Sequence, residues 1–273
     1  MRILSVFLSL CVVSSLASSC GLHLPSGKSE RKPRIVGGTE TTIDKHPSAA
    51  VLLDYNQNLN HHWHKCSAVI VNVRSVVTAA ACVREFIPVT TWRVRVGSSF
   101  LSSGGVIHTA SRLFLHPDYN MCTRDNDIAI IRLATAIEYN ENVQRAYIAG
   151  KNYIVYENQA VVAVGWGIYD QVTYPGRGSE QLREVVVRTT NWEKCGEVYK
   201  RRTGLNVTQS MICTNTEVGR RQCQGDTGGP IYHNGVFVGV HVWDDVERDC
   251  SNPDVPAINM KVSNYVDWIS QNV

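Results

Sequence analysis

Short β-rich runs recur along the chain, and turn signals separate each of them from the next. Many are rich in Val, Ile and Tyr or alternate between apolar and polar residues, as half-buried antiparallel strands require. The runs that fit this description are 49–53, 67–71, 92–96, 127–133, 159–164, 184–188 and 236–242. Strands spaced in this way predict an all-β fold, built either as barrels or as a sandwich.

One segment, near the C-terminus, is convincingly helical. Ser263 fits an N-cap, and after it Tyr265, Trp268 and Ile269 fall on one face at helical spacing. The sequence therefore predicts a single α-helix, at the C-terminal end.

The first 19 residues have the pattern of a secretory signal peptide. Arg2 gives a positive start, residues 3–16 form a short apolar stretch, and residues 17–19 are small, as at a cleavage site. The stretch is too short for a membrane span, and no later run reaches about 18 apolar residues. We therefore expect a secreted, extracellular protein with no membrane partner.

A short basic segment, residues 20–34, follows and has little apolar content, which predicts a flexible pro-segment. Residues 1–34 hold five Lys and Arg and one acid, a charge of +4, so subtraction from the whole-chain +3 leaves residues 35–273 at −1. This balance argues against a nucleic-acid partner. The 239 residues from 35 to 273 suffice for two average domains or for one large all-β unit.

Nine cysteines in a chain expected to be exported indicate disulfides. Cys11 belongs to the signal peptide, so eight cysteines remain after its removal. A zinc site is the competing interpretation of clustered cysteines, but the chain has no close Cys-x-x-Cys pair. Disulfides are therefore the preferred interpretation.

Two other motifs carry weaker signals. Residues 61–64 (HHWH) have no carboxylate close by, so we interpret them as a solvated loop and expect neither a metal nor a cofactor. Asn206 begins the single N-glycosylation sequon of the chain, NVT.

Residues 223–230 (CQGDTGGP) and 78–82 (TAAAC) carry the most specific signal. Together with 92–99 (WRVRVGSS), 165–167 (GWG) and 262–269 (VSNYVDWI), they resemble the chymotrypsin/trypsin family of serine endopeptidases. Residues 92–99, with 103–105 (SGG), look most like its insect digestive branch. The resemblance covers nearly all of residues 35–273 and implies one trypsin-like domain, with two antiparallel six-stranded β-barrels and a C-terminal α-helix.

The same resemblance assigns the catalytic triad. Asp127 matches the carboxylate, Ala81 stands where the family has its histidine base, and Thr227 stands where it has its serine nucleophile. A methyl group cannot accept the hydroxyl proton, and the β-branch of Thr227 restricts its χ1. We therefore interpret the Thr227 hydroxyl as making a local hydrogen bond. The backbone N–H groups of Gly225 and Thr227 match the oxyanion hole.

The substitutions around Asp127 predict a perturbed carboxyl. In the family this group accepts hydrogen bonds from the histidine and from a serine, which Ala81 and Val242 replace here. With both donors gone, desolvation should raise the pKa of Asp127. The alternative is that water fills the space and solvates the carboxylate.

The specificity pocket departs from the family as well. Arg221 stands six residues before Thr227, where trypsin-like relatives carry the aspartate that binds Lys or Arg, so it would repel basic side chains. The other interpretation of Arg221 is an outward surface charge. The remaining altered pocket positions are Val242, Trp243, Asp244 and Ala257.

The resemblance also implies activation by cleavage and a set of disulfides. A protease partner would cut after Arg34, and the new Ile35 amino group would pair with Asp226. The implied disulfides are Cys66–Cys82, Cys195–Cys213 and Cys223–Cys250. Cys20 and Cys122 are left over, and we expect them to join and tether the pro-segment to the body.

Three functions stay open at this point. The first is an inactive homologue that binds a peptide, an inhibitor or a protease. The second is an active endopeptidase of altered specificity, for which His241 is the nearest replacement base. The third is a structural protein that uses the frame alone.

Overall fold

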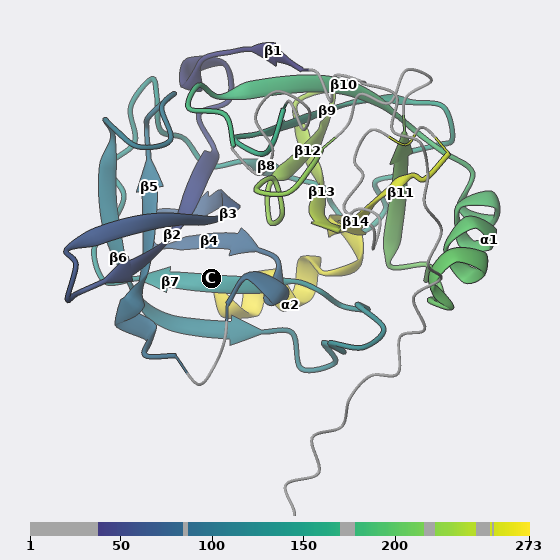
Figure 1. Ribbon diagram of the computed structural model, residues 1–273, viewed down its shortest axis with the longest axis horizontal. Coiled ribbons are helices and arrows are strands. Elements are labelled where there is room, and N and C mark those ends of the chain that lie inside the picture. Colours follow the sequence, from purple (N-terminus) through teal and green to yellow (C-terminus); the bar gives the residue numbers. More distant parts are fainter. Residues whose placement is uncertain (1–37, 84–86, 170–177, 216–221, 244–251, 253) are drawn as a thin grey trace, which may run out of the picture.

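The computed structural model describes residues 38–83, 87–169, 178–215, 222–243, 252 and 254–273. Six antiparallel strands close into a first barrel (Figure 1). Around this barrel they follow the order β2 (Ala49–Asn56), β3 (His61–Asn72), β4 (Ser75–Thr78), β7 (Ala129–Leu133), β6 (Val106–Leu115) and β5 (Trp92–Val96). Strand β5 pairs back onto β2, so this barrel has no free edge.

A second set of six antiparallel strands closes in the same way, because β9 pairs with both β10 and β12. Its order is β9 (Ala160–Gly165), β10 (Arg183–Thr189), β11 (Met211–Asn215), β14 (Ala257–Lys261), β13 (Val236–Trp243) and β12 (Pro230–His233). Two short strands pair with this barrel in addition: β1 (Thr39–Glu40) with β10 and β8 (Tyr147–Ile148) with β13. Two six-stranded antiparallel barrels were predicted, and the structure confirms them.

Several strands were missed from the sequence, and three of them, β4, β6 and β12, lack a clear alternation. All four residues of β4 are buried, β12 begins at a proline, and β6 is largely exposed or half-buried. The predicted run 127–133 begins as a strand two residues later, at Ala129. Short or irregular strands of this kind leave little periodic signal.

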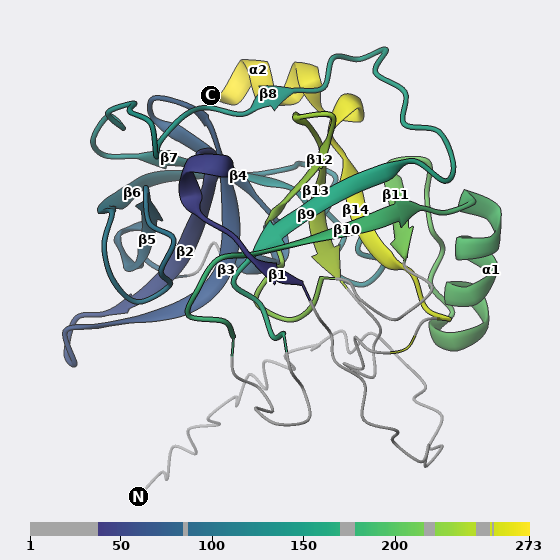
Figure 2. The same ribbon diagram turned by 90° about the horizontal axis from the view of Figure 1, so that it is seen from above.

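Two α-helices are present in the described residues, and the sequence predicted one. Helix α1 (Trp192–Thr203) was missed, although its termini follow ordinary rules. The side chain of Asn191 caps it by accepting from the Lys194 N–H at 2.9 Å, and Gly204 ends it with φ 74°. Figure 2 shows α1 at the outer edge of the second barrel.

The C-terminal helix α2 (Val266–Asn272) was predicted, but its start was wrong. Ser263 lies in a 3₁₀ turn, η4 (Val262–Asn264), and makes no capping bond. Helix α2 returns the chain from the second barrel to the first, where Tyr265 and Trp268 pack on the ring of His116. Within the described ranges no helix has the length and apolarity needed to cross a bilayer. The remaining 3₁₀ turns are η1 (Ile43–Lys45), η2 (Ala80–Cys82) and η3 (Val89–Thr91).

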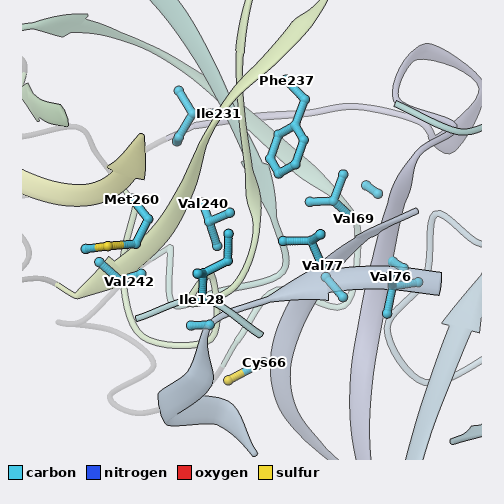
Figure 3. Close-up of a cluster of buried hydrophobic side chains, with 14 of the residues drawn as sticks. Cys66, Val69, Val76, Val77, Ile128, Ile231, Phe237, Val240, Val242 and Met260 are labelled. Carbon is cyan, nitrogen blue, oxygen red and sulfur yellow. The ribbon is translucent and has the colours of Figure 1, made fainter. Parts of the chain in front are cut away.

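Side chains from both barrels meet in a shared core. Figure 3 shows Ile128 among valines of β3 and β4 and apolar residues of β12, β13 and β14. Ile128 is fully buried, and Ser48 and Tyr232 join the barrels by a buried 2.7 Å hydrogen bond. Asp127 directly precedes Ile128, so its position is fixed by the packing between the barrels.

Candidate active site

The loop around Thr227 is held by both barrels. Ser67 of β3 donates its N–H to the Thr227 carbonyl at 2.8 Å, and its hydroxyl donates to the Gly225 carbonyl at 3.1 Å. From the other side, the Gly228 N–H donates to the carbonyl of His241 on β13 at 2.6 Å. These bonds place residues 225–228 at the junction of the two barrels.

Ala81, Asp127 and Thr227 converge at this junction. Turn η2 carries Ala81, whose N–H donates to Asp127 Oδ1 at 2.7 Å. The sulfur of Cys82, the next residue, lies 3.8 Å from the Thr227 carbonyl oxygen. The structure therefore brings together the three residues that the sequence assigned to the triad.

The carboxyl of Asp127 is completely buried, and its second oxygen is unsatisfied. Oδ2 has no hydrogen-bond partner among the described residues. Burial raises the pKa of Asp127 to about 6, against the lowering effect of the Ala81 N–H. The raised pKa and its cause agree with the expectation from the sequence.

The Thr227 hydroxyl differs from that expectation. No hydrogen bond joins it to another described residue, so the predicted local bond was wrong. The N–H groups of Gly225 and Thr227 likewise donate to none of the described carbonyls. Both groups are left available for a ligand oxygen, as an oxyanion hole requires.

Asp226 accepts two backbone hydrogen bonds. The Gly167 N–H donates to Oδ1 at 2.7 Å, and the Cys223 N–H donates to Oδ2 at 2.9 Å. A surface pocket beside it is lined by Asp226, Gln222 and Gly38. Arg34 and Ile35, the predicted activation junction, lie outside the described residues.

Comparison with known proteins agrees with this geometry. The trypsin family model matches residues 35–269. The chain is 42% identical to trypsin CFT-1 of Choristoneura fumiferana over 277 residues, which cover all of both chains. It is 45% identical to alkaline trypsin B of Manduca sexta over 241 residues, 88% of this chain and 91% of that one.

This chain belongs to the trypsin family. A solved structure of neuropsin, a serine protease expressed in the limbic system of mouse brain, superposes on this trypsin-family chain with a TM-score of 0.73. It is 27% identical and covers 86% of this chain and 97% of neuropsin.

The predicted pocket residues fall in two groups. Val242 and Trp243 lie on β13, and Ala257 begins β14 with no exposed surface. Arg221 and Asp244 lie outside the described residues, so both interpretations of Arg221 stay open.

A buried polar network lies next to these positions, and the sequence did not indicate it. Asn259 on β14 is its centre: its Oδ1 accepts from Gln222 Nε2 at 3.2 Å and lies 3.3 Å from His241 Nδ1. Its amide nitrogen donates to the Thr214 hydroxyl at 3.1 Å. All four residues are buried. The Nδ1 of His241 thus faces Asn259 and not the Thr227 hydroxyl, which argues against this nitrogen as a base for Thr227.

His64 was also misjudged. The predicted solvated loop at 61–64 is the start of β3, where His64 is half-buried, with its Nε2 enclosed and its ring against Gly225. A Cβ on Gly225, whose φ is 96°, would lie 3.0 Å from His64 Cε1, so glycine is required there. His62 instead packs on Tyr55. No group of three or more His, Cys, Asp or Glu in the described ranges is arranged to hold a metal.

The predicted disulfides and the predicted glycosylation site can be checked in part against the structure. Cys66–Cys82 and Cys195–Cys213 are bonded as the resemblance implied. Cys122 and Cys223 are also disulfide-bonded, but Cys20 and Cys250 lie outside the described residues, so those pairings remain predictions. Asn206 is exposed and accepts a hydrogen bond from Lys200 Nζ at 3.3 Å. Its glycosylation remains a prediction.

The raised pKa of Asp127 predicts a stability change with pH. Between pH 3.8 and about 6 the folded chain keeps a proton that the unfolded chain has lost, so rising pH destabilises the fold through this window. We expect Asp127→Asn to gain stability relative to the parent by about 3 kcal/mol from pH 4 to pH 8. Urea unfolding at both pH values measures the difference, and a pH-independent difference would contradict the expectation.

His64 also changes the stability of the fold with pH, so the effect of Asp127 must be measured as a difference between a variant and the parent chain. Burial lowers the pKa of His64 from 6.5 to about 4, so its contribution to stability is lost as pH falls from 6.5 to 4. This window overlaps that of Asp127 with the opposite sign. The two effects nearly cancel in the parent chain, and only the difference between Asp127→Asn and the parent isolates the carboxyl.

Proposed function

We propose that this trypsin-family chain is a secreted, catalytically inactive homologue that works by binding. The observation that carries the proposal is Ala81 beside Asp127: the carboxylate has a methyl group where the reaction needs a base. Thr227 retains a hydroxyl, but no described residue accepts its proton. An alcohol without a base is a weak nucleophile at neutral pH.

The magnitudes favour binding over residual turnover. A frame that keeps its oxyanion hole without a triad retains roughly 10³–10⁴-fold acceleration over water. Enzymes typically achieve about 10⁶-fold or more. Turnover by this chain would therefore fall well below that of a working protease.

The retained parts are those that a binding protein would use. Both barrels and the loop at 225–228 are in place, and the Gly225 and Thr227 N–H groups of this loop donate to no described carbonyl. Asp226 is held by two backbone N–H groups, and Gly38 lines the same pocket, which suits docking of a new N-terminus at Ile35. We propose a signal peptide at 1–19, a pro-segment at 20–34 and cleavage after Arg34. The ligand would be a peptide, an inhibitor or a partner protease.

The second candidate is an active endopeptidase of altered, non-tryptic specificity. It is favoured by relatives at 42–45% identity that are named trypsins. It needs a base in place of the histidine that Ala81 replaces, and the Nδ1 of His241 faces Asn259 instead. We therefore rank it second.

A fluorophosphonate probe separates the two candidates, because it labels an activated hydroxyl whatever the specificity pocket accepts. For the chain cleaved after Arg34, we expect no labelling of Thr227. The extent of labelling should equal that of the Thr227→Ala variant of the same cleaved chain. Labelling that is lost on Thr227→Ala would establish the active candidate and overturn our proposal.

Binding itself is tested with a displayed random peptide library. We expect selected peptides to lose binding when Ala81→Trp fills the cleft, and to keep it in Val186→Trp, which alters an exposed residue of β10. Enrichment of no peptide, or equal loss in both variants, would favour the purely structural alternative.

A further inference from the structure

Two arginines lie directly opposite each other on the outer face of the first barrel. Strands β6 and β7 run side by side there (Figure 1), and their register pairs the exposed Arg112 with the half-buried Arg132. The register shifts at Ser111, whose hydroxyl donates to the Arg132 carbonyl at 3.1 Å. Like charges directly opposite each other on antiparallel strands destabilise the pair. This pairing therefore carries an electrostatic cost that a bound anion would remove.

The ring of Phe114 holds both guanidiniums. It follows Arg112 by two residues on β6, so the two side chains share one face of the strand. Its centroid lies 4.6 Å from the guanidinium carbon of Arg112 and 6.0 Å from that of Arg132. An aromatic face attracts a cation placed over it. Because the ring orders two long side chains in advance, they lose less conformational entropy when they bind a ligand.

A third arginine extends this cationic surface, and no acid balances it. Arg74 is exposed in the turn between β3 and β4, and its Nη1 donates at 3.4 Å to the carbonyl of Ala134, two residues beyond Arg132. Among the described residues, none of the three arginines forms an ion pair with a carboxylate. The surrounding segments contain no acidic residue: 72–75, 110–114 and 131–134.

We propose that Arg74, Arg112 and Arg132, together the arginine surface, bind the sulfate groups of a sulfated polysaccharide. A guanidinium presents a planar fork of N–H donors, which can pair with two oxygens of one tetrahedral oxyanion. Neighbouring cations on adjacent strands suit a polymer that carries several such groups along its length. The arginine surface lies outside the cleft around Thr227. Of the proposed function it uses only secretion, because sulfated polysaccharides are extracellular polymers.

Other polyanions fit the arginine surface less well. Residues 35–273 carry a net charge of −1, so three local arginines do not make the broad basic footprint of a nucleic-acid-binding protein. An anionic membrane is recognised by clusters of roughly four to eight basic residues. A protein partner needs a central apolar anchor, whereas the ring of Phe114 is half-buried and has guanidiniums over it.

A heparin hexasaccharide is the probe, and calorimetric titration at low salt measures its binding. We expect Arg112→Gln with Arg132→Gln to weaken binding by about tenfold or more, because charge-assisted hydrogen bonds are lost. The matched control is Arg188→Gln with Arg201→Gln, which removes two exposed arginines of β10 and α1 and the same net charge. The control should keep its affinity within about twofold, since its charges lie on other elements. Equal weakening in both double variants would overturn the site.

The salt dependence of binding counts the contacts. Each cation that displaces a counterion from a polyanion adds about one to the negative slope of log K against log salt concentration. The slope of the Arg112→Gln, Arg132→Gln variant should therefore fall by about two relative to the parent, and that of the control should not. Arg112→Lys with Arg132→Lys keeps the charge and loses the fork, so its slope should stay while its affinity falls. An unchanged slope in the glutamine variant would contradict the proposal.

Three further ligands test the choice of polysaccharide. The same hexasaccharide without its sulfates should not bind, and a hexaglutamate peptide and phosphatidylserine vesicles should bind more weakly at equal charge concentration. Tighter binding of the peptide or the vesicles, or equal binding of the desulfated sugar, would overturn the assignment of the ligand. Urea unfolding of each variant confirms that it is folded. These measurements do not involve the cleft, so their failure leaves the proposed peptide binding standing, and loss of peptide binding leaves the arginine surface standing.

Discussion

Ala81→His combined with Thr227→Ser is expected to raise the rate of labelling by a fluorophosphonate at least ~10³-fold over the parent chain. The structure already supplies the other parts: Asp127 Oδ2 has no hydrogen-bond partner among the described residues and can orient a histidine, and the Gly225 and Thr227 N–H groups donate to no described carbonyl. Removal of the base or the nucleophile from a serine protease costs about 10⁶-fold in kcat. Recovery of even a small part of that factor is measurable.

Single variants are the controls, because triad members act as a unit. Ala81→His alone and Thr227→Ser alone should each recover little, and Ala81→Gln with Thr227→Ser should recover nothing beyond Thr227→Ser. A double variant no faster than the single ones would show that the carboxylate cannot orient the new ring. Labelling without peptide cleavage would instead show that the pocket, not the triad, blocks substrates.

Both barrels could be predicted because the motifs of the family occur in the right order between residue 78 and residue 269, and the family resemblance implies this fold. It predicted the perturbed carboxyl of Asp127 because burial and missing donors follow from single substitutions. It could not predict the network of Gln222, His241 and Asn259, since three separate segments must fold before these side chains meet. No local pattern marks such a cluster.

Two other misses had local causes. Residues 61–64 were interpreted as a solvated loop because no carboxylate stands close by to complete a metal site, yet strand β3 runs into the barrel from its exposed start, so burial increases along it. Helix α1 has a negative mean hydropathy and only two buried residues, which hides its periodicity. Its Asn191 cap and Gly204 stop were the usable signals.

Gly228→Ala is expected to destabilise the fold by about 4 kcal/mol or more, among the largest effects of a single substitution. Gly228 has φ 84°, and a Cβ there would lie 2.2 Å from Thr78 Oγ1 and 2.3 Å from the Ser67 carbonyl oxygen. Ser67 and Thr78 belong to β3 and β4 of the first barrel and are fully buried, so neither can retreat. Urea unfolding with intact disulfides measures the loss.

Gly235→Ala is the control that separates the two causes of the loss expected for Gly228→Ala, the steric clash of the new Cβ and the strain of a positive φ. Gly235 has a similar φ of 78°, in the two-residue turn between β12 and β13, but a Cβ there would meet nothing within 4 Å. Its substitution should cost only about 1–2 kcal/mol, the usual penalty of a left-handed conformation for alanine. The difference between the variants, about 2–3 kcal/mol or more, then reports the contact between the loop at 225–228 and the first barrel. Equal losses would mean that this loop is not clamped between the barrels, and Thr227 would lose its fixed position beside Ala81.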